Sequence, residues 1–222
     1  MKNKKMMTML LALGLVTATG VGASLAYLTD KTEVLDNKFT FANGIKMQLD
    51  EDKVDPNTHK LAENGTDAII AGQTPNGNTY LDVMPGEKLH KDPTVTIKAG
   101  SPDCYVFVSV KNPSSDKLSL NIRDSWKEVE KVNDDTTIYV YVDGNGNPLV
   151  VNKSDGDQRL NEVFTTVEVA GDGETGKDRN GEKVNLSDII VKSSAVQSKV
   201  DGKDKYEKVA AEGIALLKDA AK

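Results

Sequence analysis

The sequence contains few of the residues from which catalytic sites and covalent cross-links are usually built. Its 222 residues include one cysteine and two histidines, and aromatic residues make up 5%. With a single cysteine, no disulfide can form within the chain, so the fold has to be held together by its core. The two histidines, His59 and His90, form no His-Glu-x-x-His motif, which excludes the usual helical zinc site of metallopeptidases. Both lie in polar turn segments, and we expect them to be solvated rather than metal ligands.

The sequence also offers no favourable cysteine nucleophile and no phosphate-binding motif. Cys104 lies in the apolar run Cys104–Val108, where burial disfavours the thiolate that a nucleophile needs, so we expect a buried structural residue. No glycine-rich phosphate-binding loop follows an expected strand. The net charge of −6 argues against a nucleic-acid partner, because phosphate binding rests on clustered Lys and Arg. We therefore predict no catalytic residue, no cofactor and no metal ligand.

Three acidic turns carry oxygen atoms of the kind that bind cations. The segment Asp143–Asn147 is similar to the start of a calcium-binding loop, but Pro148 and Ser154 occupy the positions where such loops have Gly and Glu. We predict a β-hairpin turn there, since Asp-Gly and Asn-Gly supply the positive φ angles that such turns need. Asp155–Asp157 and Asp172–Glu174 are interpreted as ordinary acidic turns, with weak calcium binding left open.

The one long apolar run, Met6–Val16, lies near the N-terminus. Three lysines precede it, and a stretch of small residues follows it and ends in Ser24 and Ala26, which suit the −3 and −1 positions of a signal-peptidase site. The run has 11 residues, whereas a bilayer-spanning helix needs roughly 20. We predict a signal-peptide helix over 1–26, cleaved before Tyr27, with only transient membrane contact. An uncleaved anchor is the alternative.

Removal of this segment leaves 196 residues with a net charge of −9, because the first 26 residues carry three lysines and no acidic residue. Such a chain is long enough for one domain with a sizeable core, expected over 38–222. An exported protein without disulfides fits bacterial export better than a eukaryotic secretory route. We therefore predict a secreted bacterial protein.

Alternating apolar residues predict a series of short strands. The run Tyr105–Val110 is apolar on both faces, which indicates a central strand covered on both sides. Trp126 is interpreted as a core residue rather than a binding residue. The other expected strands lie at Lys38–Leu49, Thr94–Lys98, Leu118–Ile122, Ile138–Val142, Pro148–Val151, Val163–Val169 and Val184–Val196. Many short strands with frequent turns and little helix predict an antiparallel β-sandwich, and we favour the jelly-roll form.

Three segments fall outside this strand pattern. Residues 50–82 are polar and rich in turn residues, and we predict a long excursion that is either functional or poorly ordered. Near the C-terminus, apolar residues recur at helical spacing, which predicts an amphipathic closing helix over 204–221 that packs on the sheet. Residues 27–37 precede the first expected strand and have no obvious partner within the chain.

Several motifs resemble the TasA and camelysin family of bacterial secreted proteins. The start of the chain combines a small-residue tail, a segment ending in Asp, and an Asn-x-Phe strand entry. The motifs stand in the family's order at Gly20–Asp30, Asn37–Gly44, Met84–Glu87, Lys91–Thr96, Cys104–Val108 and Ala195–Gln197. The chain departs from the family pattern at Leu28, where an aromatic residue is common, and in the excursion 50–82.

The resemblance implies a jelly-roll domain and a role as a subunit of biofilm matrix fibres. In such fibres the N-terminal segment of one subunit completes the sheet of the next by strand addition. For this chain the implied donor segment is 27–37, with Tyr27, Leu28, Val34 and Leu35 as its contacts. The implied partners are further copies of the chain, a signal peptidase of the SipW type and other matrix proteins.

Two alternatives belong to other functional classes. Camelysin relatives are described as metalloendopeptidases, so the resemblance also allows a surface peptidase, against which the missing zinc motif weighs. A monomeric surface or adhesion module is the other alternative, in which the excursion 50–82 binds a partner.

Overall fold

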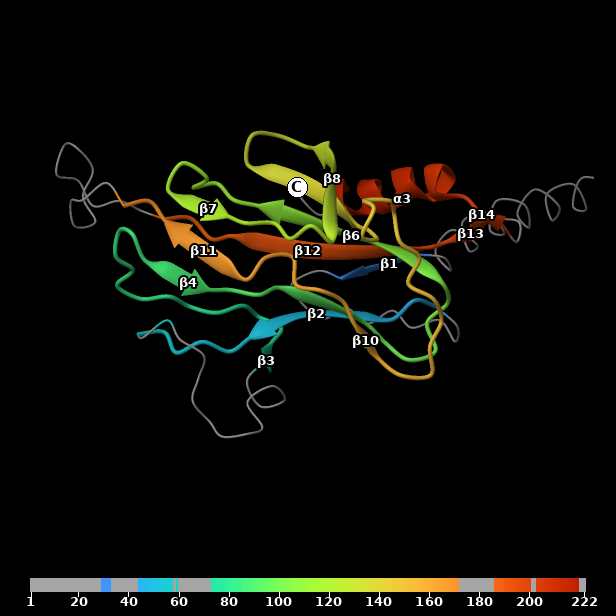
Figure 1. Cartoon of the computed structure of the whole chain (residues 1–222), viewed down its shortest axis with the longest axis horizontal. Helices are drawn as coiled ribbons and strands as arrows, with labels where there is room; N and C mark the ends of the chain where they lie inside the picture. Colours follow the sequence, from blue (N-terminus) through green and yellow to red (C-terminus); the bar gives the residue numbers. More distant parts are fainter. Residues whose placement is uncertain are drawn as a thin grey trace, which may run out of the picture.

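The computed structural model describes residues 29–32, 44–57, 59, 73–171, 186–200 and 203–219. Within these ranges the protein is mainly β, with strands β1 to β14 and one helix, α3 (Figure 1). Every strand pairing between described residues is antiparallel. The prediction of a mainly β, antiparallel protein is therefore confirmed. None of the described helical structure is long and apolar enough to cross a membrane.

The largest sheet has five strands in the order β1-β12-β6-β9-β8. At its centre, β6 (Cys104–Lys111) pairs with β12 (Ile190–Gln197) on one side and with β9 (Thr136–Tyr141) on the other. Every residue of β6 except the last is buried, which confirms the predicted central strand covered on both faces. The outer strands are β1 (Thr29–Thr32) and β8 (Trp126–Lys131).

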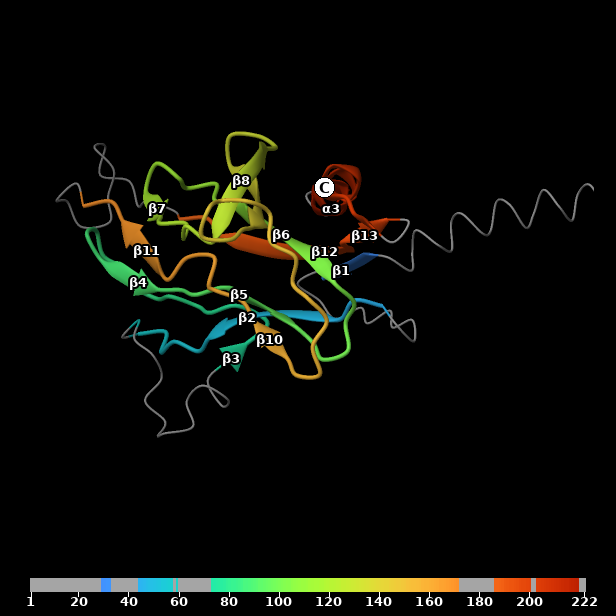
Figure 2. The same ribbon diagram turned by 45° about the vertical axis from the view of Figure 1, so that its right-hand side comes forward.

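A second layer faces this sheet (Figure 2). It is a four-stranded sheet in the order β10-β5-β2-β3, formed by β10 (Gln158–Arg159), β5 (Thr94–Ile97), β2 (Met47–Asp52) and β3 (Gln73–Thr74). Alternate residues of β6, including Val106 and Val108, belong to one buried apolar cluster together with Val95 and Ile97 of β5. The main core therefore lies between the two layers.

Smaller sheets complete the fold. β4 (Lys88–His90), β11 (Thr166–Val169) and β7 (Leu118–Leu120) form a three-stranded sheet at one end of the molecule (Figure 1). The two-stranded ribbon of β13 (Lys199–Val200) and β14 (Lys203–Asp204) leads from β12 into the helix.

Helix α3 (Tyr206–Asp219) covers the outer face of the five-stranded sheet, as both views show. Its buried residues Val209 and Leu217 share a second apolar cluster with Phe107 of β6. Gly213 lies against the Phe107 ring so closely that a Cβ at this position would stand 2.6 Å from it. The predicted closing helix is thus confirmed, with narrower bounds, since Asp204 belongs to β14 and residues 220–222 lie outside the described residues.

Other expectations are confirmed at the level of single residues. Cys104 is fully buried, and burial raises the pKa of its thiol to about 12, as the apolar run predicts. Trp126 is buried, packs edge-to-face on Tyr141 and donates from Nε1 to the carbonyl oxygens of Asn161 and Glu162 at 3.1 Å each. Trp126 is therefore a core residue.

The boundary of the predicted excursion is wrong at its start. Asp50, Glu51 and Asp52 continue strand β2 instead of leaving the sheet, and Gln73–Thr74 returns as β3 to pair with Glu51 and Asp52. Polar residues continue this strand because its carboxylates find charged partners within the fold, which a reading based on apolar alternation does not register. Half of the predicted first strand, Lys38–Leu49, lies outside the described residues, which resume at residue 44.

Candidate functional sites

The first described strand lies at the rim of the five-stranded sheet. β1 pairs with β12 from Thr29 opposite Val196 to Thr32 opposite Ser193. Its four residues, Thr-Asp-Lys-Thr, are all polar, and its main chain pairs with β12 in an antiparallel ladder. β1 is therefore an edge strand with little apolar anchoring of its own.

The structure tests only part of the N-terminal predictions. The predicted cleavage and donor residues lie outside the described residues: Ser24, Ala26, Tyr27, Leu28, Val34 and Leu35. The expectation that segment 27–37 has no partner in its own chain is wrong for Thr29–Thr32, which pair with β12. This pairing is not visible in the sequence because the partner strand lies near the other end of the chain.

The two edges of the five-stranded sheet differ in character. β8 carries four charged side chains among its six residues and a register shift between Glu128 and Glu130, which are features that protect an edge against further pairing. β12, on which β1 lies, pairs with β6 over eight residues without a register shift. If β1 leaves, a regular strand presents its backbone groups for pairing.

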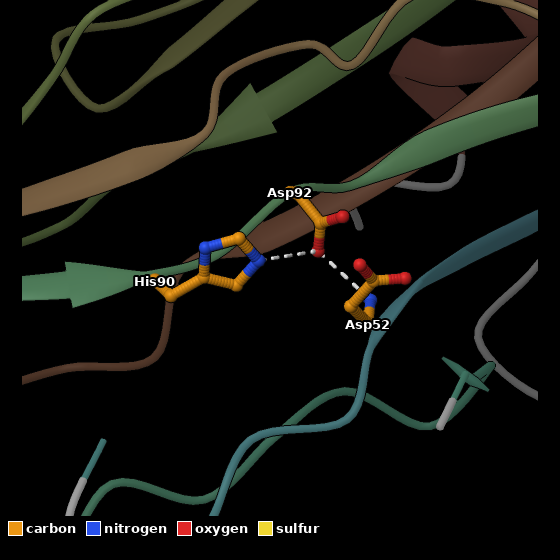
Figure 3. A group of neighbouring side chains, drawn as sticks. All are labelled: Asp52, His90 and Asp92. Carbon is orange, nitrogen blue, oxygen red and sulfur yellow. Dashed lines mark hydrogen bonds and ion pairs between the residues drawn. The ribbon is translucent and has the colours of Figure 1, made fainter. Parts of the chain in front are cut away.

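A second candidate site lies where the carboxylates of Asp52 and Asp92 meet the imidazole of His90 (Figure 3). Asp52 ends β2, His90 ends β4, and Asp92 lies in the connection from β4 to β5. One ligand atom from each residue lies within 4.8 Å of the other two. Nε2 of His90 is 3.6 Å from Oδ1 of Asp92, and the backbone N–H of Asp52 donates to the same Oδ1 at 2.8 Å.

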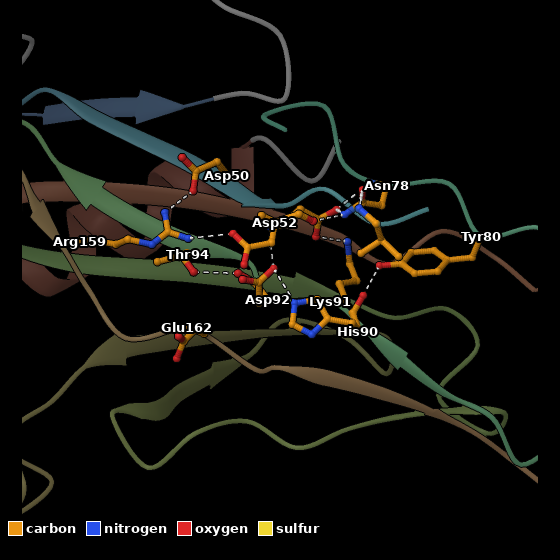
Figure 4. A network of polar contacts seen from close by, with 12 residues as sticks. Asp50, Asp52, Asn78, Tyr80, His90, Lys91, Asp92, Thr94, Arg159 and Glu162 are labelled. Atoms are coloured by element: carbon orange, nitrogen blue, oxygen red, sulfur yellow. Dashed lines mark hydrogen bonds and ion pairs between the residues drawn. The ribbon is translucent and has the colours of Figure 1, made fainter. Parts of the chain in front are cut away.

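Two close ion pairs flank this cluster (Figure 4). Lys91 Nζ donates to Oε2 of the buried Glu51 at 2.6 Å, and Arg159 Nη1 donates to Oδ1 of the buried Asp50 at 2.6 Å. Buried carboxylates are rare unless they are paired, and each of these two has a cation in direct contact.

Asp92 is buried to the same extent but lacks such a partner. It is 5% exposed, and among the described residues no Lys or Arg lies within ion-pair distance of its carboxylate. Burial raises the pKa of Asp92 to about 6, and the charges of Asp52 and Glu51 add to this, against the lowering effect of the Asp52 amide and of His90. Nε2 of His90 is itself buried and has no hydrogen-bond partner within the described part of the chain.

Sequence reasoning missed this cluster. His90 was expected to be solvated, whereas its side chain is 32% exposed and its Nε2 atom is buried against Asp92. The one local sequence pattern that could have indicated a metal site is His-x-Asp, formed by His90 and Asp92. Asp52 joins the group only through the β2–β5 pairing, in which Asp50 lies opposite Thr94.

The solvated interpretation is also wrong for His59, which is 6% exposed. Its Nδ1 lies 2.5 Å from Oε1 of Glu87, and its Nε2 lies 2.7 Å from the carbonyl oxygen of Leu81. Because both neighbours are acceptors, both ring nitrogens have to donate, which requires the imidazolium form. His59 therefore ties the excursion to the connection that precedes β4.

The carboxylates of two acidic turns, Asp143 and Asp157, accept hydrogen bonds from groups of the same chain. Oδ1 of Asp143 accepts hydrogen bonds from the backbone N–H groups of Asn145 and Asn147 at 2.9 Å each, as the predicted turn requires. Asp157 accepts from the backbone N–H of Ala99 and from Lys98 Nζ, both at 2.9 Å. Asp172–Glu174 lies outside the described residues.

Comparisons of the chain with protein-family models, with curated proteins and with solved structures give no match.

Proposed function

We propose that the protein is a secreted bacterial extracellular matrix protein that assembles into fibres by head-to-tail strand addition. The observation that carries the proposal is β1, a short polar strand near the N-terminus that occupies the edge of β12. In the proposed fibre, β1 of one copy lies on β12 of the next copy in place of the acceptor's own strand.

The exchange is energetically feasible because it breaks and remakes the same strand pairing. Four residues leave one edge and four identical residues occupy it, so the change in contacts is small. The balance between the two states then depends on protein concentration and on the freedom of the connecting segment. Since the donor and acceptor surfaces differ, each added copy exposes a new edge, and the assembly grows as a filament instead of closing as a symmetric dimer.

The proposal includes membership of the TasA and camelysin family, a jelly-roll arrangement and a cleaved signal-peptide helix. It is supported by the order of the sequence motifs, by the two facing antiparallel layers and by the closing helix. A signal peptidase of the SipW type would free the segment that begins at Tyr27, so that exchange starts only after export. The proposed role is structural, without catalytic residues, in a biofilm matrix that also contains other proteins.

The test compares purified protein that begins at Tyr27 with protein that begins at Lys38, by electron microscopy. We expect fibres from the first and none from the second, which keeps the acceptor strand but lacks the donor. Protein beginning at Lys38 should also act as a chain terminator, because a copy that accepts but cannot donate stops growth. Adding one part in ten to the longer protein should therefore shorten its fibres.

Two outcomes would contradict the proposal. Fibres of equal number and length from both proteins would exclude β1 as the donor. A protein beginning at Tyr27 that stays monomeric at high concentration in size-exclusion chromatography would favour the monomeric surface module instead. Circular dichroism of both proteins shows whether the shorter one is folded, so that a missing fibre is not mistaken for a misfolded subunit.

A further inference from the structure

The cluster of Asp52, His90 and Asp92 lies in a region with more negative than positive charge. Figure 4 shows Asp50, Asp52 and Asp92 close together with Lys91 and Arg159. A further carboxylate, that of the buried Glu51, lies against Lys91. Lys91 is engaged by Glu51 at 2.6 Å, and Arg159 by Asp50 at 2.6 Å. Arg159 reaches Asp52 only at 4.0 Å, with its Nη2. Two negative charges thus remain without a close positive partner among the described residues.

The sheet register brings these two charges together. β2 and β5 pair in antiparallel register with Asp50 opposite Thr94, and extending that register by two residues places Asp52 opposite Asp92. Like charges directly opposite each other destabilise an antiparallel pair. A cation between the two carboxylates would remove this repulsion.

The distance between His90 and Asp92 also fits a shared ligand. A separation of 3.6 Å between Nε2 and Oδ1 is too long for a hydrogen bond. Two atoms that each lie about 2.1 Å from one metal ion stand roughly 3 to 4 Å apart, depending on the coordination angle. The Nε2 atom is buried and has no hydrogen-bond partner among the described residues. A metal ion bound to this nitrogen would satisfy it.

We propose that Asp52, His90 and Asp92 bind one divalent cation of the manganese-to-zinc series. One imidazole nitrogen and two carboxylate oxygens suit these ions, whereas magnesium and calcium prefer sites made of oxygen alone. The three ligand atoms lie within 4.8 Å of one another, and rotation of Asp52, whose side chain is 28% exposed, would bring its carboxylate to the metal. Water would fill the remaining coordination positions.

The ion would cross-link the end of β2 to the connection between β4 and β5. Asp52 ends β2 of the four-stranded sheet and His90 ends β4 of the three-stranded sheet, so the site joins these two sheets. Binding would stabilise the folded chain because the unfolded chain does not bring the three ligands together. The proposal does not rest on fibre formation, since none of its three residues belongs to β1 or β12.

The test is isothermal titration calorimetry of tag-free protein with zinc and, separately, with manganese, together with thermal unfolding in the presence and absence of each ion. We expect one ion per chain and a raised unfolding temperature with metal. His90→Gln and Asp92→Asn should each weaken binding at least tenfold. Asp92→Asn keeps the oxygen that accepts from the Asp52 amide, so the strand connection is preserved.

His59→Asn is the matched control, because it removes the other histidine and should leave binding unchanged. Cobalt in place of zinc gives a second readout, since its visible absorption reports nitrogen and oxygen ligation and should disappear in His90→Gln. If His90→Gln fails to fold, Asp52→Asn, at a partly exposed position, decides the question by the same titration. Absence of saturable binding up to millimolar metal, or equal binding by the wild type and the ligand variants, would overturn the proposal.

Discussion

The two faces of the protein are packed in different ways. On the outer face of the five-stranded sheet, α3 covers an apolar cluster in which rings of Phe107 and Tyr206 stack with their centroids 6.3 Å apart. Around β2, in the other layer, buried carboxylates are matched one by one with Lys91, Arg159 and backbone amides.

The two kinds of packing differ in how strongly they depend on geometry and in how they respond to substitution. Apolar packing is non-directional and loses stability in proportion to the volume removed. A buried ion pair contributes little net stability, yet it is strongly destabilising when one partner is lost, because the other charge stays buried. The α3 face should therefore respond to changes in size, and the β2 region to changes in charge. The following four variants test this contrast, from the largest expected effect to the smallest.

Phe107→Ala should give the largest loss of stability. Phe107 is fully buried and contacts α3 through Tyr206 and Gly213. We expect the free energy of unfolding, measured by urea titration, to fall by about 4 kcal/mol, as for other buried aromatic residues. Leu149→Ala, at a position that is 39% exposed, is the control and should change little. A loss below about 1 kcal/mol would mean that α3 contributes little to the core.

Lys91→Met should lower the free energy of unfolding almost as much, because it leaves a buried charge without its partner. It removes the cation 2.6 Å from the buried Glu51 and leaves a carboxylate with Asn78 as its one remaining donor among the described residues. We expect a loss of about 3 kcal/mol. Adding Glu51→Gln should restore most of it, because the buried charge disappears with its partner. Additive losses in this double-mutant cycle would show that the two side chains do not act as a pair.

Gly213→Ala tests the apolar face by adding volume. In most helix interiors this change stabilises, since Ala is the better helix former. Here the new Cβ would stand 2.6 Å from the Phe107 ring, so we expect a loss of about 2 kcal/mol instead. Gly144→Ala is the control, because no atom of the described residues other than its chain neighbours lies within 4 Å of the added Cβ. Unfolding should be followed by circular dichroism, and a stabilised Gly213→Ala would contradict the close approach of α3.

His59→Asn should have the smallest effect and one that depends on pH. Burial lowers the pKa of His59, but hydrogen bonds to Glu87 and Leu81 outweigh it, so the pKa lies above the ordinary 6.5. For Glu87, burial raises the pKa, but the hydrogen bonds from His59 and from the Met84 backbone N–H, together with the charge of His59, outweigh this, so the pKa lies below the ordinary 4.5. Asn tolerates the left-handed backbone of this position, where φ is 57°.

The sign of the pH dependence follows from these two directions. The stabilisation by His59 is complete below its unfolded pKa and disappears as pH rises through its folded pKa. The stabilisation by Glu87 is complete above its unfolded pKa and disappears as pH falls through its folded pKa. We expect the difference between wild type and His59→Asn to reach about 1.5 kcal/mol near pH 5.5 and to shrink toward pH 9. A difference that is constant from pH 5 to pH 9 would exclude the imidazolium.

The apolar half of the molecule could be predicted well from the sequence. Residues Tyr105–Val108 form a continuous apolar run, and the apolar residues of α3 recur about every 3.6 positions; both patterns follow from local geometry. The charged half could not. Glu51 and Lys91 show no local sign of being buried, because their partners are 40 residues apart in the chain. Polar residues in a turn-rich stretch therefore gave the wrong boundary for β2 and the wrong environment for both histidines.

The sequence by itself determined that the chain is mainly β, that Cys104 and Trp126 lie in the core and that an amphipathic helix closes the fold. It determined these features because an apolar side chain is buried against any apolar surface, so its burial does not depend on which distant residue it meets. The tertiary structure alone decided that Thr29–Thr32 lies on β12 and that Asp52 meets His90 and Asp92. Strand register and ion pairing are relations between distant segments, and they exist only once the chain has folded.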